Sequence, residues 1–200
     1  MRSESGSLEG LLAGAGVSVA AAVLMVVVLT IFHSTGPANS AIMLQNVASD
    51  VCGDICTAAL SSLPYTHIDT YTSEGITVRI TSDYVLAGDT SGNEFARPLP
   101  VRVFPGLYGS QDMIFWNDTG ELRNYLNRTV GSTGTEEQPF NSTGGNQAAA
   151  LMEKACRDLA INPLCINTAR PLTVEKLFLY TCNDSSHAKE SEPYVFVYQR

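Results

Sequence analysis

The chain carries one long uncharged stretch near its start, LLAGAGVSVAAAVLMVVVLTIF at residues 11–32. A helix of this length spans about 33 Å, enough to cross a hydrocarbon core of about 30 Å. The apolar region of a secretory signal is shorter, at about 7–15 residues. We therefore predict a polar leader at residues 1–10 and a transmembrane helix at residues 11–33, with membrane lipid as its surroundings.

Positive charge is distributed unevenly about this stretch. Arg2 and the terminal amine precede it, and the next Lys or Arg is Arg79. Because cationic flanks stay on the cytoplasmic side, the sequence predicts a single-pass membrane protein with a cytoplasmic N-terminus and an extracytoplasmic C-terminal domain. Four Asn-x-Ser/Thr glycosylation candidates follow the stretch and agree with this topology: Asn117, Asn127, Asn141 and Asn183.

The composition limits the partners of the extracytoplasmic part. The formal net charge of the chain is −8, and charged residues make up only 16% of it. Nucleic acid and an anionic lipid surface both attract a basic patch, so neither is expected to bind this domain. The residues beyond the membrane stretch suffice for one hydrophobic core, and we expect a single domain there.

Residues 38–63 are predicted to form an amphipathic stem helix. Pro37 lacks an amide donor and bends the chain before the stem, and Pro64 ends it. Apolar side chains recur at helical spacing: Leu44, Val47, Ala48, Val51, Cys52, Ile55 and Ala59. The opposite face carries Asn46, Asp50, Gly53 and Thr57.

From residue 65 the pattern becomes that of β-strands, and we name residues 65–200 the head domain. Strands are predicted at residues 76–80, 100–104, 112–116, 174–182 and 194–198. A turn is expected at residues 117–120, an exposed, mobile loop at residues 131–147 and a helix at residues 147–160. The predicted fold class is α+β: a long N-terminal helix, transmembrane and then stem, followed by an antiparallel, β-rich head with one further helix.

Five cysteines follow the membrane stretch: Cys52, Cys56, Cys156, Cys165 and Cys182. The first two lie four residues apart on the apolar side of the stem, too far apart for a comfortable bond with each other. We expect at least one of them to bond a cysteine of the head domain, with the pairing left open and one thiol either free or bonded between chains. A zinc site at this pair is disfavoured, because the spacing to His67 or His187 follows no zinc-binding pattern.

The sequence contains no pattern typical of a catalytic, metal or cofactor site. His33, His67 and His187 lie in no nucleophile or HExxH context. The acidic residues at positions 83, 89 and 94 are interpreted as solvated loop residues. We therefore predict no enzymatic activity and no cofactor, and a membrane-tethered enzyme is the least favoured class of function.

The segment Ser7-Leu8-Glu9-Gly10-Leu11-Leu12 is polar and then acidic at the mouth of the apolar helix. It resembles the Ser-x-Glu core of the class III signal segments of archaeal type IV pilin-like proteins. Where that family has a basic residue, Gly and Gln before the core, this chain has Ser3-Glu4-Ser5 and then Gly6. The resemblance implies a structural or minor subunit of a cell-surface filament or secretion assembly, whose partners are other pilin-like subunits or copies of itself.

The apolar stretch also has the composition of an assembly helix. Gly16 and Ala20 belong to a series of small residues that let helices approach each other closely. The resemblance implies that Glu9 pairs with the terminal amine of a neighbouring subunit. In the alternative interpretation, Glu9 only favours the positive end of the helix dipole at the membrane edge.

Two other interpretations of the whole chain stay open. In the first, it is a single-pass surface protein that does not assemble and whose head binds a partner, a glycan or a surface. In the second, it is secreted, because Ala38-Asn-Ser40 before Ala41 resembles a signal peptidase site.

The predicted topology is tested by protease treatment of intact cells. Protease added outside should remove the residues from 38 onward, because the charge asymmetry places them outside the cytoplasm. A cytoplasmic protein of the same cells serves as the control for lysis. Protection of the head until the membrane is opened would contradict the topology.

Overall fold

The computed structural model describes residues 25, 40–71, 75–110, 113–167, 170–183 and 188–199. Residues 43–199, within these ranges, belong to one compact unit. The predicted leader and, apart from Met25, the predicted transmembrane helix lie outside the described residues. Across the described ranges, no helix combines the length and the apolar character needed to span a bilayer.

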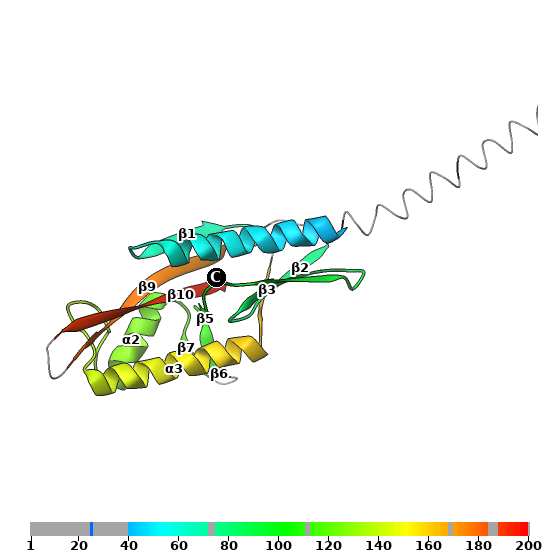
Figure 1. Ribbon diagram of the computed structural model, residues 1–200. Coiled ribbons are helices and arrows are strands. Elements are labelled where there is room, and N and C mark those ends of the chain that lie inside the picture. The colour runs from blue at the N-terminus through cyan, green and yellow to red at the C-terminus, as the bar shows by residue number, and fades with distance from the viewer. Residues whose placement is uncertain are drawn as a thin grey trace, which may run out of the picture. The chain divides into compact units, whose positions relative to one another are not determined.

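From residue 40 the chain forms a helix and then a series of strands interrupted by two more helices (Figure 1). The stem helix covers residues 40–60, within the predicted range. The strands are β1 (Tyr65–Asp69), β2 (Ile76–Ile80), β3 (Tyr84–Asp89), β4 (Glu94–Pro98), β5 (Val103–Pro105), β6 (Tyr108–Ser110), β7 (Met113–Trp116), β8 (Leu164–Ile166), β9 (Leu172–Cys182) and β10 (Lys189–Gln199). The other helices are α2 (Thr119–Val130) and α3 (Ser142–Ile161). An α+β fold rich in antiparallel strands is thereby confirmed.

The strands form two sheets and a short ribbon. The first sheet has the order β1-β9-β10-β5, and only its β10-β5 pair is parallel. Its central pair, β9 and β10, runs antiparallel from Leu172 opposite Gln199 to Cys182 opposite Lys189. The second sheet, β4-β3-β2-β8, is antiparallel throughout, and β6 pairs with β7.

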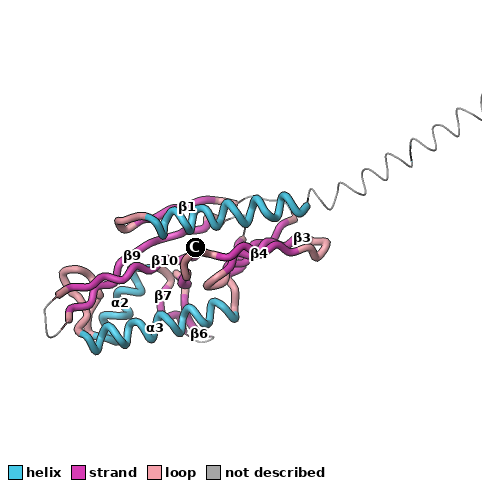
Figure 2. Tube along the Cα trace, viewed as in Figure 1, coloured by secondary structure: helices cyan, strands magenta, loops and turns pink. Residues whose placement is uncertain are grey.

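The first sheet is buried on both faces. Val195 and Val197 of β10 belong to one hydrophobic cluster, with the stem helix and the second sheet, whereas Tyr194 and Phe196 belong to another, with α2 and α3. Side chains of a strand alternate between faces, so consecutive residues of β10 serve different cores. Figure 2 shows the stem helix on one side of β9 and β10 and the helices α2 and α3 on the other. This explains the unbroken apolar run at residues 194–198.

The stem helix rests on this sheet with the face that the sequence marks as apolar. Its fully buried side chains include Ala48, Val51 and Ile55. The helix ends against a buried cation: Lys176 of β9 donates from Nζ to the carbonyls of Ala59, at 2.6 Å, and Ser61, at 2.5 Å. A cation at a helix C-terminus satisfies carbonyls that lack intrahelical donors and interacts favourably with the dipole.

The prediction of only one helix in the head was wrong, because residues 117–120 start a helix and do not form a simple turn. The Asp118 side chain caps α2 by accepting from the Glu121 amide at 2.8 Å. Glu121 in turn accepts from the amide of Asn117, the residue before the N-cap, at 3.3 Å, so the two side chains bind amides on both sides of the helix start. Leu122 and Leu126, one helical turn apart, are fully buried and hold α2 in the second core.

The prediction of an exposed loop at residues 131–147 was also wrong in two places. Helix α3 begins at Ser142, five residues earlier than expected, because the Asn141 side chain caps it by accepting from the Gly144 amide at 2.7 Å. Phe140 is buried and joins β9, donating its amide to the Tyr180 carbonyl at 2.9 Å.

Replacing Lys176 by Met tests how the stem is held on the sheet. The variant leaves two carbonyls at the end of the stem helix without their charged donor, and we expect a loss of about 1.5–3 kcal/mol in the free energy of unfolding. Lys189→Met is the matched control, because Lys189 is exposed and donates to a single carbonyl, that of Glu136. Its effect should stay within about 0.5 kcal/mol in the same denaturant titration. Equal effects of the two substitutions would contradict this role of Lys176.

Candidate functional site

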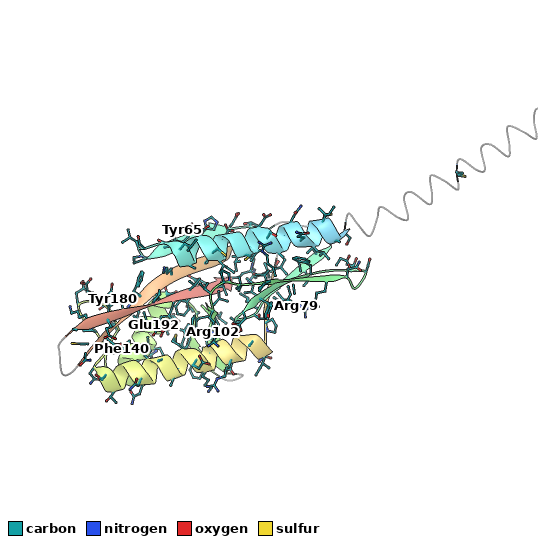
Figure 3. The ribbon with its side chains drawn as sticks, in the orientation of Figure 1. Tyr65, Arg79, Arg102, Phe140, Tyr180 and Glu192 are labelled. Carbon is teal, nitrogen blue, oxygen red and sulfur yellow. The ribbon has the colours of Figure 1, made fainter. Side chains whose placement is uncertain are left out.

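A cluster of potential metal ligands lies where the stem helix meets β1. Asp54 comes from the stem helix, and His67 and Asp69 come from β1. Residues two apart on a strand point to the same side, so β1 presents the imidazole and the carboxylate together. The edge strand β1 is held in place by β9, with His67 opposite Val174. In Figure 3, Tyr65 marks β1 beside the stem helix, and its ring stacks on that of His67.

The imidazole of His67 faces both carboxylates at distances longer than hydrogen bonds. Its Nε2 atom lies 3.6 Å from Oδ1 of Asp54 and 3.9 Å from Oδ2 of Asp69. This nitrogen is buried, and among the described residues it has no hydrogen-bond partner. The side chains are 33% exposed for His67, 27% for Asp54 and 56% for Asp69, so the cluster is open to solvent on the side of Asp69.

The carboxylates of the cluster are oriented by neighbouring groups. The Tyr71 hydroxyl donates to Oδ2 of Asp54, and the Thr70 amide donates to Oδ1 of Asp69 at 2.7 Å. Burial raises the pKa of Tyr71, and so do its bond to Asp54 and the negative charges of Asp69 and Asp50. The phenol therefore stays protonated and remains a donor to Asp54 throughout the physiological range.

The stem cysteines are close to each other but not bonded. All five cysteines are free thiols, and Sγ of Cys52 lies 3.7 Å from Sγ of Cys56, beyond the bond length of about 2.05 Å. Cys52 is buried next to the Pro98 carbonyl of β4. Burial, followed by the hydrogen bond with Cys52, raises the pKa of the Cys56 thiol. A bond from the stem to Cys156, Cys165 or Cys182 stays a prediction.

The four glycosylation candidates are exposed and lie in different settings. Asn117 precedes α2, Asn127 lies within it, Asn141 caps α3 and Asn183 follows β9. Their exposure leaves room for a glycan at each position. Use of these positions stays a prediction.

Two of the acidic residues that were interpreted as solvated loop residues, Asp89 and Glu94, shape a hairpin, whereas Asp83 is exposed just before β3, in agreement with that interpretation. Asp89 ends β3 and accepts the amides of Ser91 and Asn93, each at 2.9 Å, so it closes the turn to β4. Glu94 begins β4 and pairs with Arg79 of β2. The contacts of Asp89 and Glu94 within this hairpin therefore explain their acidic side chains without a binding site.

The residues predicted to mediate assembly, Glu9, Gly16 and Ala20, lie outside the described residues, as do His33 and His187. Sequence reasoning missed the cluster of Asp54, His67 and Asp69. The signal that could have found it is the His-x-Asp pair on one side of a strand that directly follows an amphipathic helix. Its third member, Asp54, is brought near only by the packing of that helix on the sheet.

Comparison of the chain with models of protein families, with curated proteins and with solved structures finds no match.

Alkylation tests the environment of the stem thiols. Because a raised pKa lowers the thiolate fraction at a given pH, Cys56 in the native chain should react more slowly with iodoacetamide at pH 8 than in the urea-unfolded chain. Cys165, which is exposed, serves as the control and should react at similar rates in both states. Peptide mapping without reduction reports in the same experiment whether either stem cysteine is bonded to the head. Equal native and unfolded rates at Cys56 would contradict the prediction.

Proposed function

We propose that this chain is a membrane-anchored, pilin-like structural or minor subunit of a cell-surface filament or secretion assembly. Residues 11–33 anchor it and pack against other subunits, and the head is displayed outside the cell. The Ser-x-Glu segment at Ser7 to Glu9 and the small residues Gly16 and Ala20 motivate the proposal, because they combine a charged contact with a surface for close helix packing.

The observation that carries the proposal is the way the stem helix is built into the head. A subunit held by its N-terminal helix needs a firm connection between that helix and the displayed domain. The stem buries Ala48, Val51 and Ile55 on the first sheet, and Lys176 holds its C-terminal end. Along the described residues 43–60 the stem therefore belongs to the head's own core, which supports a role in bearing load.

The proposal gives separate roles to the two ends of the chain. Glu9 pairs with a neighbouring amine during assembly, which requires processing of the leader near this residue. The head, with its acidic character and four exposed sequons, forms the outer surface.

Substitutions in the apolar stretch test assembly. Gly16→Leu with Ala20→Leu should lower the crosslinked, oligomeric fraction in native membranes by about tenfold, because bulky side chains keep the helices apart. Val27→Leu with Val28→Leu is the matched control, since it enlarges residues that are already large in the same stretch. Membrane insertion should be the same in both variants.

Glu9→Gln should in addition impair incorporation into filaments. Crosslinking that finds only monomers, together with surface filaments that never contain the chain, would overturn the proposal. The non-assembling surface protein would then take its place.

A further inference from the structure

We propose that Asp54, His67 and Asp69 form a binding site for one divalent transition-metal ion, with zinc as the ion that suits it best. The site is independent of assembly: it fastens the stem helix to β1, whether or not the chain enters a filament.

The distances within the cluster are those of ligands that surround an ion. Tetrahedral ligands about 2.0–2.1 Å from zinc lie about 3.3 Å from one another. Nε2 of His67 is 3.6 Å and 3.9 Å from its two carboxylate oxygens, and all three ligand atoms lie within 4.8 Å of each other. The two distances from Nε2 exceed this spacing by about 0.3 Å and about 0.6 Å, so small side-chain movements bring the imidazole and each carboxylate to coordination distance.

The buried Nε2 atom of His67 is the second observation that points to a ligand. Buried polar atoms are nearly always hydrogen-bonded, and this one has no such bond to any residue in the described part of the chain. A protonated imidazole donating to either aspartate would approach it to about 2.7–2.9 Å, which neither distance reaches. A neutral nitrogen that offers its lone pair to an ion accounts for both the burial and the spacing.

The charges of the cluster call for a cation. Asp54 and Asp69 face the same imidazole. Both aspartates line a shallow cleft, together with Asp50. Within the described part of the chain, neither Asp54 nor Asp69 forms an ion pair with a lysine or arginine. A divalent ion would neutralise the two carboxylates that contact it.

The donor set selects the kind of ion. One imidazole nitrogen with two carboxylate oxygens suits zinc and its neighbours in the first transition row, whereas calcium and magnesium prefer oxygen alone. Three protein ligands leave one tetrahedral position, on the exposed side of Asp69, for water or an external ligand. Tyr71 supplies the outer hydrogen bond that ligating carboxylates usually receive.

Zinc binding to the full-length chain in mild detergent tests the site. After treatment with chelator and alkylation of the thiols, the chain should bind one zinc ion in calorimetric titration with ZnCl2, and its unfolding temperature should rise. MgCl2 at equal concentration should have no such effect. Cobalt should give the absorption spectrum of a tetrahedral site without a thiolate band.

Single substitutions assign the ligands. Asp54→Asn, His67→Gln and Asp69→Asn should each weaken zinc binding more than the 10–100-fold loss typical of removing an outer hydrogen bond, and Tyr71→Phe should cost about 10–100-fold. Asp50→Asn, in the same cleft, and His187→Gln, elsewhere in the sequence, are the controls and should bind normally. The unfolding temperature of each metal-free variant reports whether it folds.

Three outcomes would overturn the proposal. One is the absence of saturable zinc binding by the alkylated chain. Another is zinc binding that disappears on alkylation, which would assign the ion to cysteines. The third is binding that is unchanged in His67→Gln.

Discussion

The pairing of β9 with β10 is the constraint on which the rest of the structure depends. The two strands are hydrogen-bonded along their full length, and each face of the pair is covered by helices. β1 and β5 extend the sheet at its edges, the stem helix covers one face, and α2 and α3 cover the other. Burial of both faces removes the apolar side chains of this pair from water, and the stabilisation scales with the area removed.

Two adjacent charged residues of β9 decide which helix packs on which face. Lys176 points to the stem and donates to carbonyls at its end, whereas Glu175 points to the opposite face. There Glu175 accepts from the hydroxyls of Thr119, at 2.7 Å, and Tyr198, at 2.9 Å. A helix docked on the wrong face would leave a buried charge without partners, which is strongly unfavourable. These polar contacts therefore add specificity to a largely apolar core.

Local patterns were sufficient for the stem and for some strands, and insufficient where tertiary pairing decides. The bounds of β2 match the prediction because Ile76, Val78 and Ile80 alternate with polar residues. β10 begins at Lys189, five residues before the predicted start, because the polar residues there pair with β9 without an apolar pattern of their own.

The elements and the cluster that the sequence patterns did not predict lack a clear signal along the chain. Helix α2 contains Gly120, Asn124 and Asn127, whose low helix propensity hides the spacing of its leucines. The strands β3 and β4 were also missed in the sequence, because the turn that joins them is polar. The cluster of Asp54, His67 and Asp69 joins residues whose proximity depends on how the stem packs on the sheet, and spacing along the chain does not report that.

The central place of β10 has a consequence for how the protein is made. Residues 189–199 follow every other element in synthesis, yet they lie between β9 and β5 in the first sheet. The sheet cannot close until this strand has left the ribosome. Until then, the apolar side chains of the earlier elements that pack against β10 stay exposed to solvent. Contacts between residues far apart in the sequence also form slowly. The order of the strands therefore makes completion of the first sheet a late step of folding.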